Sequence, residues 1–298
     1  MIKSLWNTLS TNIQDLFSII PRTTQASGIS VHVINPLTQQ QVQQQINEFE
    51  QSITTGLWLN IDKQTLIADI KARVLDPFQV NQGGQPFCGP ASIVFELVRT
   101  QPLRYVQICR SLFETGGFDT QTRRVESSVR LRQSYGRLQM SQADWLVMAT
   151  LRDCENILFP VEPEGSEILR NLAGITKPWE MKGWCHEILG YHQVKHTITE
   201  IYGEFHALQD AAAIITGGGV VFALITAEGL LENKTSFLPY PDHWITILGD
   251  ISVQVQNPSK FSQGEVSCDV YSWGKRMHVN VQQGPLENYF WGLVTGQM

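Results

Sequence analysis

The spacing of apolar residues changes from helical to strand-like near Gly217, and this change most constrains the fold. Before it, apolar residues recur three or four positions apart, as on one face of a helix. After three glycines, residues 220–225 form a short continuous apolar run, typical of a buried strand. Helices followed by antiparallel strands predict an α+β fold, with a helical N-terminal half packed on a C-terminal antiparallel β-sheet.

The pattern also gives the approximate extent of each element. Helices are expected over residues 1–21, 38–56 (with Thr38 as the cap), 62–75, 88–99, 102–115, 121–134, 141–151 (with Ser141 as the cap), 165–173, 178–189 and 204–216. Strands are expected over 191–201, 220–225, 243–248, 251–255, 266–273 and 277–281.

A glycine-rich loop leads directly into one cysteine, Cys88, at the start of the helix expected over 88–99. The unpaired backbone N–H groups of a first helical turn and the positive end of the helix dipole favour a thiolate there. Gln82 lies six residues upstream, where its amide can reach the sulfur, and is a better candidate than Gln85, which stands next to a rigid proline. A nucleophile with a nearby amide donor is half of an acyl-transfer site.

A histidine at the start of a later strand supplies the other half. His243 precedes an apolar strand pattern and is the predicted general base. Asp269 is the predicted third residue, because a carboxylate can accept the ring N–H and orient the imidazole. Asp250 and Ser272 remain alternatives for that position.

These residues resemble the pattern of the papain-like cysteine peptidase superfamily. The matching positions are Gln82, Cys88-Gly89, His243 and the segment Ser272-Trp273-Gly274. The Gly-Pro-Ala after Cys88 resembles bacterial double-glycine-peptidase-like and toxin or effector members more than papain itself. Tyr271 stands where the superfamily has an asparagine.

The resemblance implies a papain-like catalytic domain at residues 81–298, preceded by a helical extension at residues 1–80. It implies a bacterial effector or toxin that hydrolyses an amide bond of a protein or peptide, with an immunity or chaperone protein as a further partner class. Cys88 would attack the carbonyl, His243 would transfer the proton, and Gln82 with the Cys88 backbone N–H would bind the oxyanion. A peptidoglycan amidase or endopeptidase, an acyltransferase and a catalytically inactive binding module remain alternatives.

Composition narrows the classes of partner. The net charge of −6 and the scattered basic residues argue against nucleic acid. No apolar run is long enough to predict a membrane span. Five widely spaced cysteines suggest folding in a reducing cytosol, which is compatible with export by a system that needs no cleaved signal. No cofactor or metal is predicted, since His192 and His196 would lie about 13 Å apart along a strand.

Overall fold

A computed structural model describes residues 35–134, 140–155, 176–199, 203–235, 239–255 and 264–298. The expected helices at 1–21 and 165–173 lie outside the described residues.

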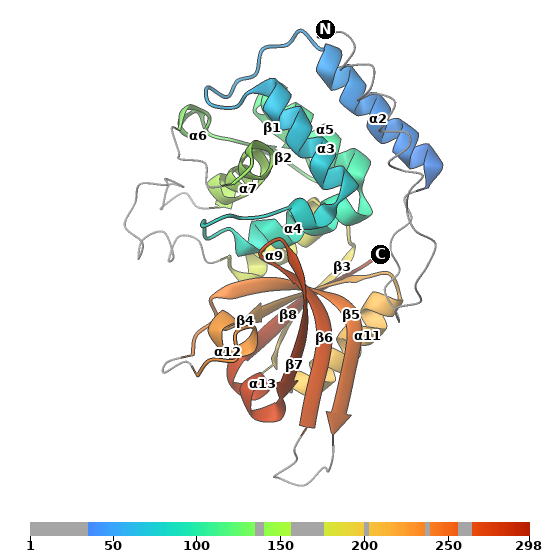
Figure 1. Cartoon of the computed structure of the whole chain (residues 1–298), viewed down its shortest axis with the longest axis vertical. Coiled ribbons are helices and arrows are strands. Elements are labelled where there is room, and N and C mark those ends of the chain that lie inside the picture. Colours follow the sequence, from blue (N-terminus) through green and yellow to red (C-terminus); the bar gives the residue numbers. More distant parts are fainter. Residues whose placement is uncertain (1–34, 135–139, 156–175, 200–202, 236–238, 256–263) are drawn as a thin grey trace, which may run out of the picture.

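The N-terminal half forms a layer of helices (Figure 1). This layer contains α2 (Pro36–Gln51), α3 (Lys63–Leu75), η1 (Pro77–Gln79), α4 (Cys88–Thr100), α5 (Pro102–Thr115), β1 (Gly117–Asp119), β2 (Arg124–Glu126), α6 (Val129–Gln133), α7 (Gln142–Glu155) and α9 (Pro178–Glu187). Ser141 caps α7 as predicted, its hydroxyl accepting the Asp144 N–H. The cap of α2, however, is Asn35 rather than Thr38.

The C-terminal half is a six-stranded antiparallel sheet of order β3-β8-β4-β5-β6-β7. Its strands are β3 (Gln193–Ile198), β4 (Val220–Ile225), β5 (His243–Val255), β6 (Gly264–Ser272), β7 (Lys275–Gln282) and β8 (Phe290–Gln297). The helices of this half are α11 (Glu204–Thr216), α12 (Ala227–Leu230) and α13 (Gln283–Tyr289). The arrangement confirms the predicted α+β class, with helices packed against an antiparallel sheet.

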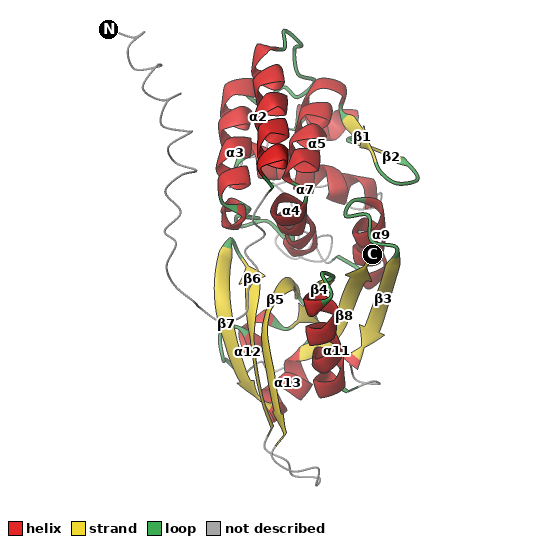
Figure 2. Ribbon diagram, turned by 90° about the vertical axis from the view of Figure 1, so that its right-hand side faces the viewer, coloured by secondary structure: helices red, strands yellow, loops and turns green. Residues whose placement is uncertain are grey.

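The sheet buries a different core on each face. Trp244 and Tyr271 belong to the core shared with the helical layer, and α4 lies directly over the sheet at β5 (Figure 2). Ile245 and Val270, one position away on the same strands, belong to a second core with α11 and α13. Alternation of side chains along β5 and β6 therefore sorts the residues between the two cores.

Strand β8 has no counterpart among the expected strands. It pairs with both β3 and β4, in the interior of the sheet. Two glycines weaken its strand pattern, but both are needed for packing. A Cβ at Gly292 would lie 2.7 Å from the backbone oxygen of Thr197, and one at Gly296 would lie 2.6 Å from the sulfur of Cys185.

The solvated helix expected over 121–134 is wrong for most of its length. Residues 124–126 form β2, which pairs with β1, and only 129–133 are helical. The turn between the strands is held by the carboxylate of Glu187, which accepts hydrogen bonds from the Thr120 and Thr122 side chains and from the Thr122 backbone N–H. This distant acceptor cannot be identified from the local pattern.

The described part of the N-terminal extension packs as part of the helical layer. Residues of α2 and α3 share one core with those of α4, α5 and α7. Arg73 of α3 makes a bidentate ion pair with the fully buried Asp144 of α7, at 2.8 and 2.7 Å. The same carboxylate accepts the backbone N–H of Asn81 at 3.1 Å. Residues before and after position 80 are thus joined through one buried charge.

Replacement of Asp144 tests this link. Asp144→Asn leaves the buried Arg73 guanidinium with only the more distant Asp69 carboxylate, at 3.9 Å, so we expect the free energy of unfolding to fall by about 3 kcal/mol. Urea denaturation measures the change. The matched control is Glu50→Gln, which breaks the half-buried pair with Lys71 and should cost less than about 1 kcal/mol. Equal losses in the two variants would contradict the central role of Asp144.

Candidate active site

The loop before Cys88 is closed by its own hydrogen bonds. The Gln85 N–H donates to the Gln82 oxygen at 3.2 Å, and Gly83 has the positive φ of 59° that such a turn requires. The Gln82 side-chain amide donates to the Gln85 oxygen at 2.9 Å. Phe87 also donates its N–H to Gln85. The predicted donor Gln82 is therefore buried in the loop, with its amide bonded to the loop backbone.

The same loop is bonded to both layers. On the helical side, the backbone N–H of Asn81 binds Asp144. On the sheet side, the Asn81 side-chain amide donates to the Trp273 oxygen at 3.3 Å, and the Tyr271 hydroxyl donates to the Val80 oxygen at 2.7 Å. Tyr271 and Asn81 thus connect the loop to the sheet.

Cys88 begins α4 and is 5% exposed. Hydrogen bonding from the backbone N–H groups of Trp244 and Gly89 favours its thiolate. Burial raises the pKa of the Cys88 thiol, while these two bonds and the charge of Arg152 act in the opposite direction. The start of α4 packs against the start of β5, because the Ser92 hydroxyl, one turn after Cys88, donates to the Trp244 backbone oxygen at 3.4 Å.

The first turn of α4 divides its backbone donors among different acceptors. The Gly89 N–H favours the Cys88 thiolate, and the Ala91 N–H bonds the Phe87 oxygen at 2.8 Å. Pro90 has no N–H to offer. The Cys88 N–H has no intrahelical acceptor, as is usual for the first turn of a helix.

His243 is the first residue of β5 and is also 5% exposed. Its Nε2 lies 2.8 Å from the Ser272 hydroxyl. The imidazole stacks on the Trp273 ring, with 4.7 Å between centroids and an interplanar angle of 27°. Burial lowers the pKa of His243 to about 4, so the ring is neutral at neutral pH. Within the described residues, no hydrogen bond joins this ring to the Cys88 sulfur.

Asp269, the predicted third residue, is not at the imidazole. In the sheet it pairs opposite Gly249, six residues along β5 from His243, which is about 20 Å. Its carboxylate instead accepts hydrogen bonds from Arg276 and lies 2.8 Å from His278 Nδ1. The alternative Asp250 is also near Arg276, at 4.0 Å. Ser272 is the residue that the structure brings to the ring, because register, which the sequence does not reveal, decides which group faces His243.

Two supporting groups have no signal in the sequence pattern. Trp244 acts through its backbone N–H, which every residue but proline has. Arg152 lies in a helix far along the chain and reads as an ordinary charged residue. The Trp273 contact does have a signal, since Ser272-Trp273-Gly274 is part of the motif described above.

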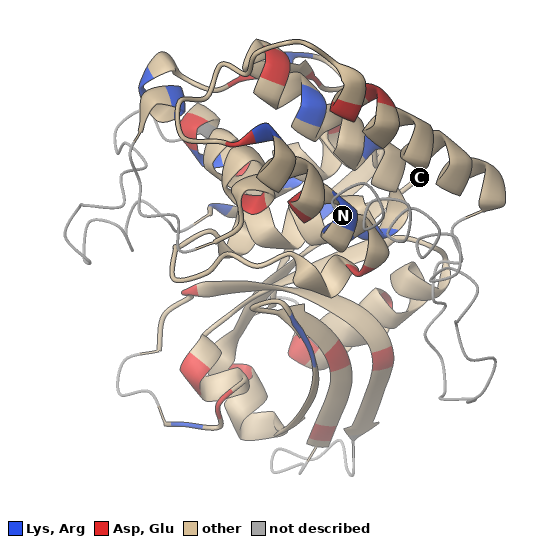
Figure 3. Cartoon of the chain, turned by 45° about the horizontal axis from the view of Figure 1, so that its top comes forward, with Lys and Arg blue, Asp and Glu red and all other residues tan. Residues whose placement is uncertain are grey.

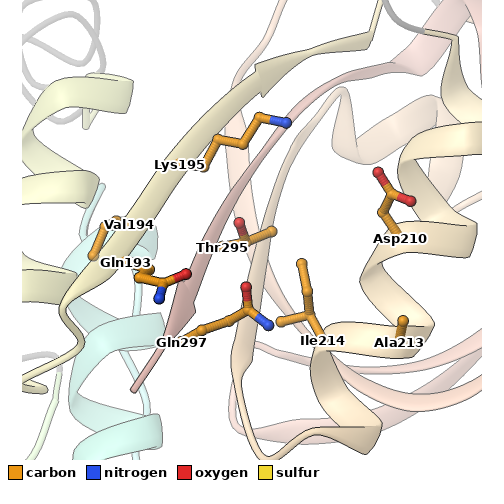
Figure 4. Close-up of a pocket in the computed structure, with 8 residues that line it drawn as sticks. All are labelled: Gln193, Val194, Lys195, Asp210, Ala213, Ile214, Thr295 and Gln297. Atoms are coloured by element: carbon orange, nitrogen blue, oxygen red, sulfur yellow. The ribbon is translucent and has the colours of Figure 1, made fainter.

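A separate pocket of about 450 Å³ lies between the edge strand β3, β8 and α11 (Figure 4). It is lined by Gln193, Val194, Lys195, Asp210, Ala213, Ile214, Thr295 and Gln297. None of these is a predicted site residue, so the pocket is distinct from the Cys88 site.

Further features of the described part of the chain are its charge distribution, its possible metal ligands and the length of its helices. Acidic and basic residues are interspersed over the helical layer (Figure 3). In the described ranges, no group of three or more His, Cys, Asp or Glu side chains is arranged to hold a metal ion. Among the same residues, every helix is too short or too polar to cross a bilayer.

Comparison with protein-family models finds no match, and comparison with curated protein sequences finds none either.

The burial of His243 predicts a pH-dependent contribution to stability. Its pKa is about 4 when folded and about 6.5 when unfolded, so between these values only the unfolded chain binds the proton. The free energy of unfolding should therefore fall as pH drops from about 6.5 to about 4, by roughly 3 kcal/mol from this group.

Urea denaturation at a series of pH values measures this loss as the difference between wild type and His243→Gln. The exposed His192 gives the matched control, since His192→Gln should keep the wild-type pH dependence. A His243→Gln protein whose stability falls with pH as steeply as that of the wild type would exclude a neutral, buried imidazole.

Proposed function

We propose that the protein is a papain-like cysteine peptidase, a bacterial effector or toxin that hydrolyses an amide bond of a protein or peptide. The observation that carries the proposal is the meeting of the α4 and β5 starts. There the backbone of Trp244, the residue that follows His243, lies against α4: its oxygen accepts the Ser92 hydroxyl at 3.4 Å, and its N–H favours the Cys88 thiolate. A thiol at a helix N-terminus beside a neutral imidazole is the chemistry of cysteine-dependent acyl transfer.

The reaction starts from an uncharged pair. His243 is neutral above about pH 4, and burial keeps the Cys88 thiol protonated. His243 removes the thiol proton as the sulfur attacks the substrate carbonyl carbon, and it then gives that proton to the leaving amine as the C–N bond breaks. Water, deprotonated by the same ring, hydrolyses the thioester and restores the thiol.

The oxyanion of the tetrahedral intermediate needs hydrogen-bond donors at the start of α4. The Cys88 backbone N–H is one, and the second amide hydrogen of Gln82 is the other, since the first is bonded to Gln85. These are the two donors that the resemblance to the superfamily implies.

Ser272 orients the base. With its hydroxyl accepting from Nε2–H, the Nδ1 atom of His243 carries the lone pair that takes the thiol proton. A hydroxyl holds the ring without placing a negative charge beside it, so the imidazolium is stabilised less than it would be by a carboxylate. Trp273 covers one face of the ring.

One observation favours a second candidate, a binding module of the same fold that has lost catalysis. Cys88 and His243 are both almost fully buried, and the Gln82 amide is bonded to its own loop. An inactive protein would keep these groups for packing alone. The two candidates differ in what happens when Cys88 is replaced.

Removal of the sulfur tests the proposal. Cys88→Ala should abolish the cleavage of proteins in a cell extract, measured by mass spectrometry of newly formed N-termini, and should abolish toxicity on expression. Alanine is close to cysteine in volume and favours a helix, so the variant should still fold. Cys154→Ser, at a partly exposed cysteine that bonds the Glu126 oxygen, is the matched control and should stay active.

The outcomes separate the alternatives. New N-termini that appear with wild type and not with Cys88→Ala support a peptidase. If wild type forms no new protein N-termini but cleaves purified peptidoglycan, the protein is an amidase of the same fold. Equal toxicity of wild type and Cys88→Ala, without cleavage of either substrate, identifies the binding module.

A second prediction concerns the base. Ser272→Ala removes one neutral hydrogen bond from the imidazole, so we expect kcat to fall about fivefold to tenfold with little change in KM. Asp269→Asn, which alters a carboxylate on the same strand but away from the ring, should leave kcat unchanged. Steady-state assays with a cleaved peptide measure both, and a larger loss in Asp269→Asn would reverse the assignment.

A further inference from the structure

Thr176 joins the two elements that hold the Cys88 sulfur. It is fully buried, and its side chain packs on Gly89 so closely that a Cβ there would lie 2.2 Å from its Oγ1. Its backbone oxygen accepts the indole N–H of Trp244 at 2.9 Å. Gly89 and Trp244 are the residues whose backbone N–H groups favour the Cys88 thiolate. The position of Thr176 therefore affects both donors.

Arg152 holds Thr176 in place. This α7 residue is 2% exposed, and its Nη1 lies 3.5 Å from Thr176 Oγ1 and 3.2 Å from Glu180 Oε2. The same Glu180 oxygen accepts the Lys177 N–H at 2.7 Å, at the start of α9. The ion pair thus anchors the two residues that precede α9 beside the start of α4.

Arg152 also supplies positive charge near the Cys88 sulfur, where the other residues of the candidate site carry none. His243 is neutral and Ser272 carries no charge. Asp242, immediately before His243, acts against a thiolate, whereas Arg152 favours one. Two charged groups act on Cys88, namely Arg152 from α7 and Asp242 from the residue before β5, and Glu180 of α9 is paired with Arg152.

We propose that Arg152 is a positioning residue of the Cys88 site. Through Thr176 it fixes the two backbone donors on the sulfur, and its buried positive charge stabilises the thiolate that forms during attack. In most Cys–His pairs the imidazolium supplies this charge. The inference rests on the proposed function only in that it takes Cys88 to be the nucleophile.

The rate at which Cys88 reacts with iodoacetamide tests the proposal, because only the thiolate reacts. The full-length protein is treated at a series of pH values, and modification of the Cys88 peptide is followed by mass spectrometry. The midpoint of the rate-against-pH curve reports the charge around the sulfur. The plateau at high pH reports its accessibility.

Three variants have distinct expected results. Arg152→Met should raise the midpoint by about one pH unit, so that the rate below the midpoint falls about tenfold. Arg152→Lys should leave the midpoint close to that of the wild type, because it keeps the positive charge. Glu180→Gln should lower the midpoint, since it removes the negative charge that offsets Arg152.

The matched control is Arg99→Met, eleven residues along α4 from Cys88, which breaks an ion pair with the buried Glu96. It should leave the midpoint unchanged. A change in the plateau alone for Arg152→Met, or a midpoint raised by Glu180→Gln, would overturn the proposal. If Arg152→Met does not fold, the midpoints of Arg152→Lys and Glu180→Gln still test the proposal.

The iodoacetamide experiment does not require the protein to hydrolyse a substrate. A wild-type protein that cleaves no substrate would overturn the proposed function. The midpoints would still show whether Arg152 controls the charge state of Cys88.

Discussion

The buried carboxylate of Asp144 is the contact on which the position of the nucleophile depends. It accepts the guanidinium of Arg73 and the backbone N–H of Asn81, so one charge from α7 fixes both α3 and the loop that leads to Cys88. A buried charge is tolerated only when its hydrogen bonds are satisfied, and here two of the partners come from segments that must be correctly placed. The helical layer and the loop are therefore built as one unit.

The sheet is attached to that unit at the same loop. Tyr271 bonds the Val80 oxygen and stacks on Phe95 of α4 at 3.8 Å, while Asn81 bonds the Trp273 oxygen. These contacts bring the start of α4 against the start of β5. The candidate site therefore lies where the two layers meet, with one half of the chemistry carried by each layer.

Apolar spacing was sufficient to predict the class of fold, because both periodicities are strong in their own halves of the chain. It was insufficient for β8, in which Gly292 and Gly296 replace the side chains that mark a strand. It was also insufficient for β2, whose turn depends on Glu187 more than sixty residues away. Contacts between distant segments are not encoded in local spacing.

The candidate site also combines residues with local sequence signals and residues whose placement depends on distant contacts. Cys88 and His243 could be predicted to begin a helix and a strand because both kinds of start leave local signals, and α4 and β5 begin at these residues. The choice between Asp269 and Ser272 depended on the register of β5 against β6, which shifts at two irregularities near Gly249. Neither the register nor the bulges can be derived from the residues of one strand.

The donors at the first turn of α4 have a consequence for how the site tolerates sequence change. The donors that favour the Cys88 thiolate belong to the backbone of Gly89 and Trp244. Pro90, the next residue of the turn, has no N–H. Point mutations replace side chains and leave these N–H groups in place, unless proline is introduced. The electrostatic part of the site can therefore persist through sequence drift that erases its recognisable motifs, provided that the fold keeps α4 and β5 in contact.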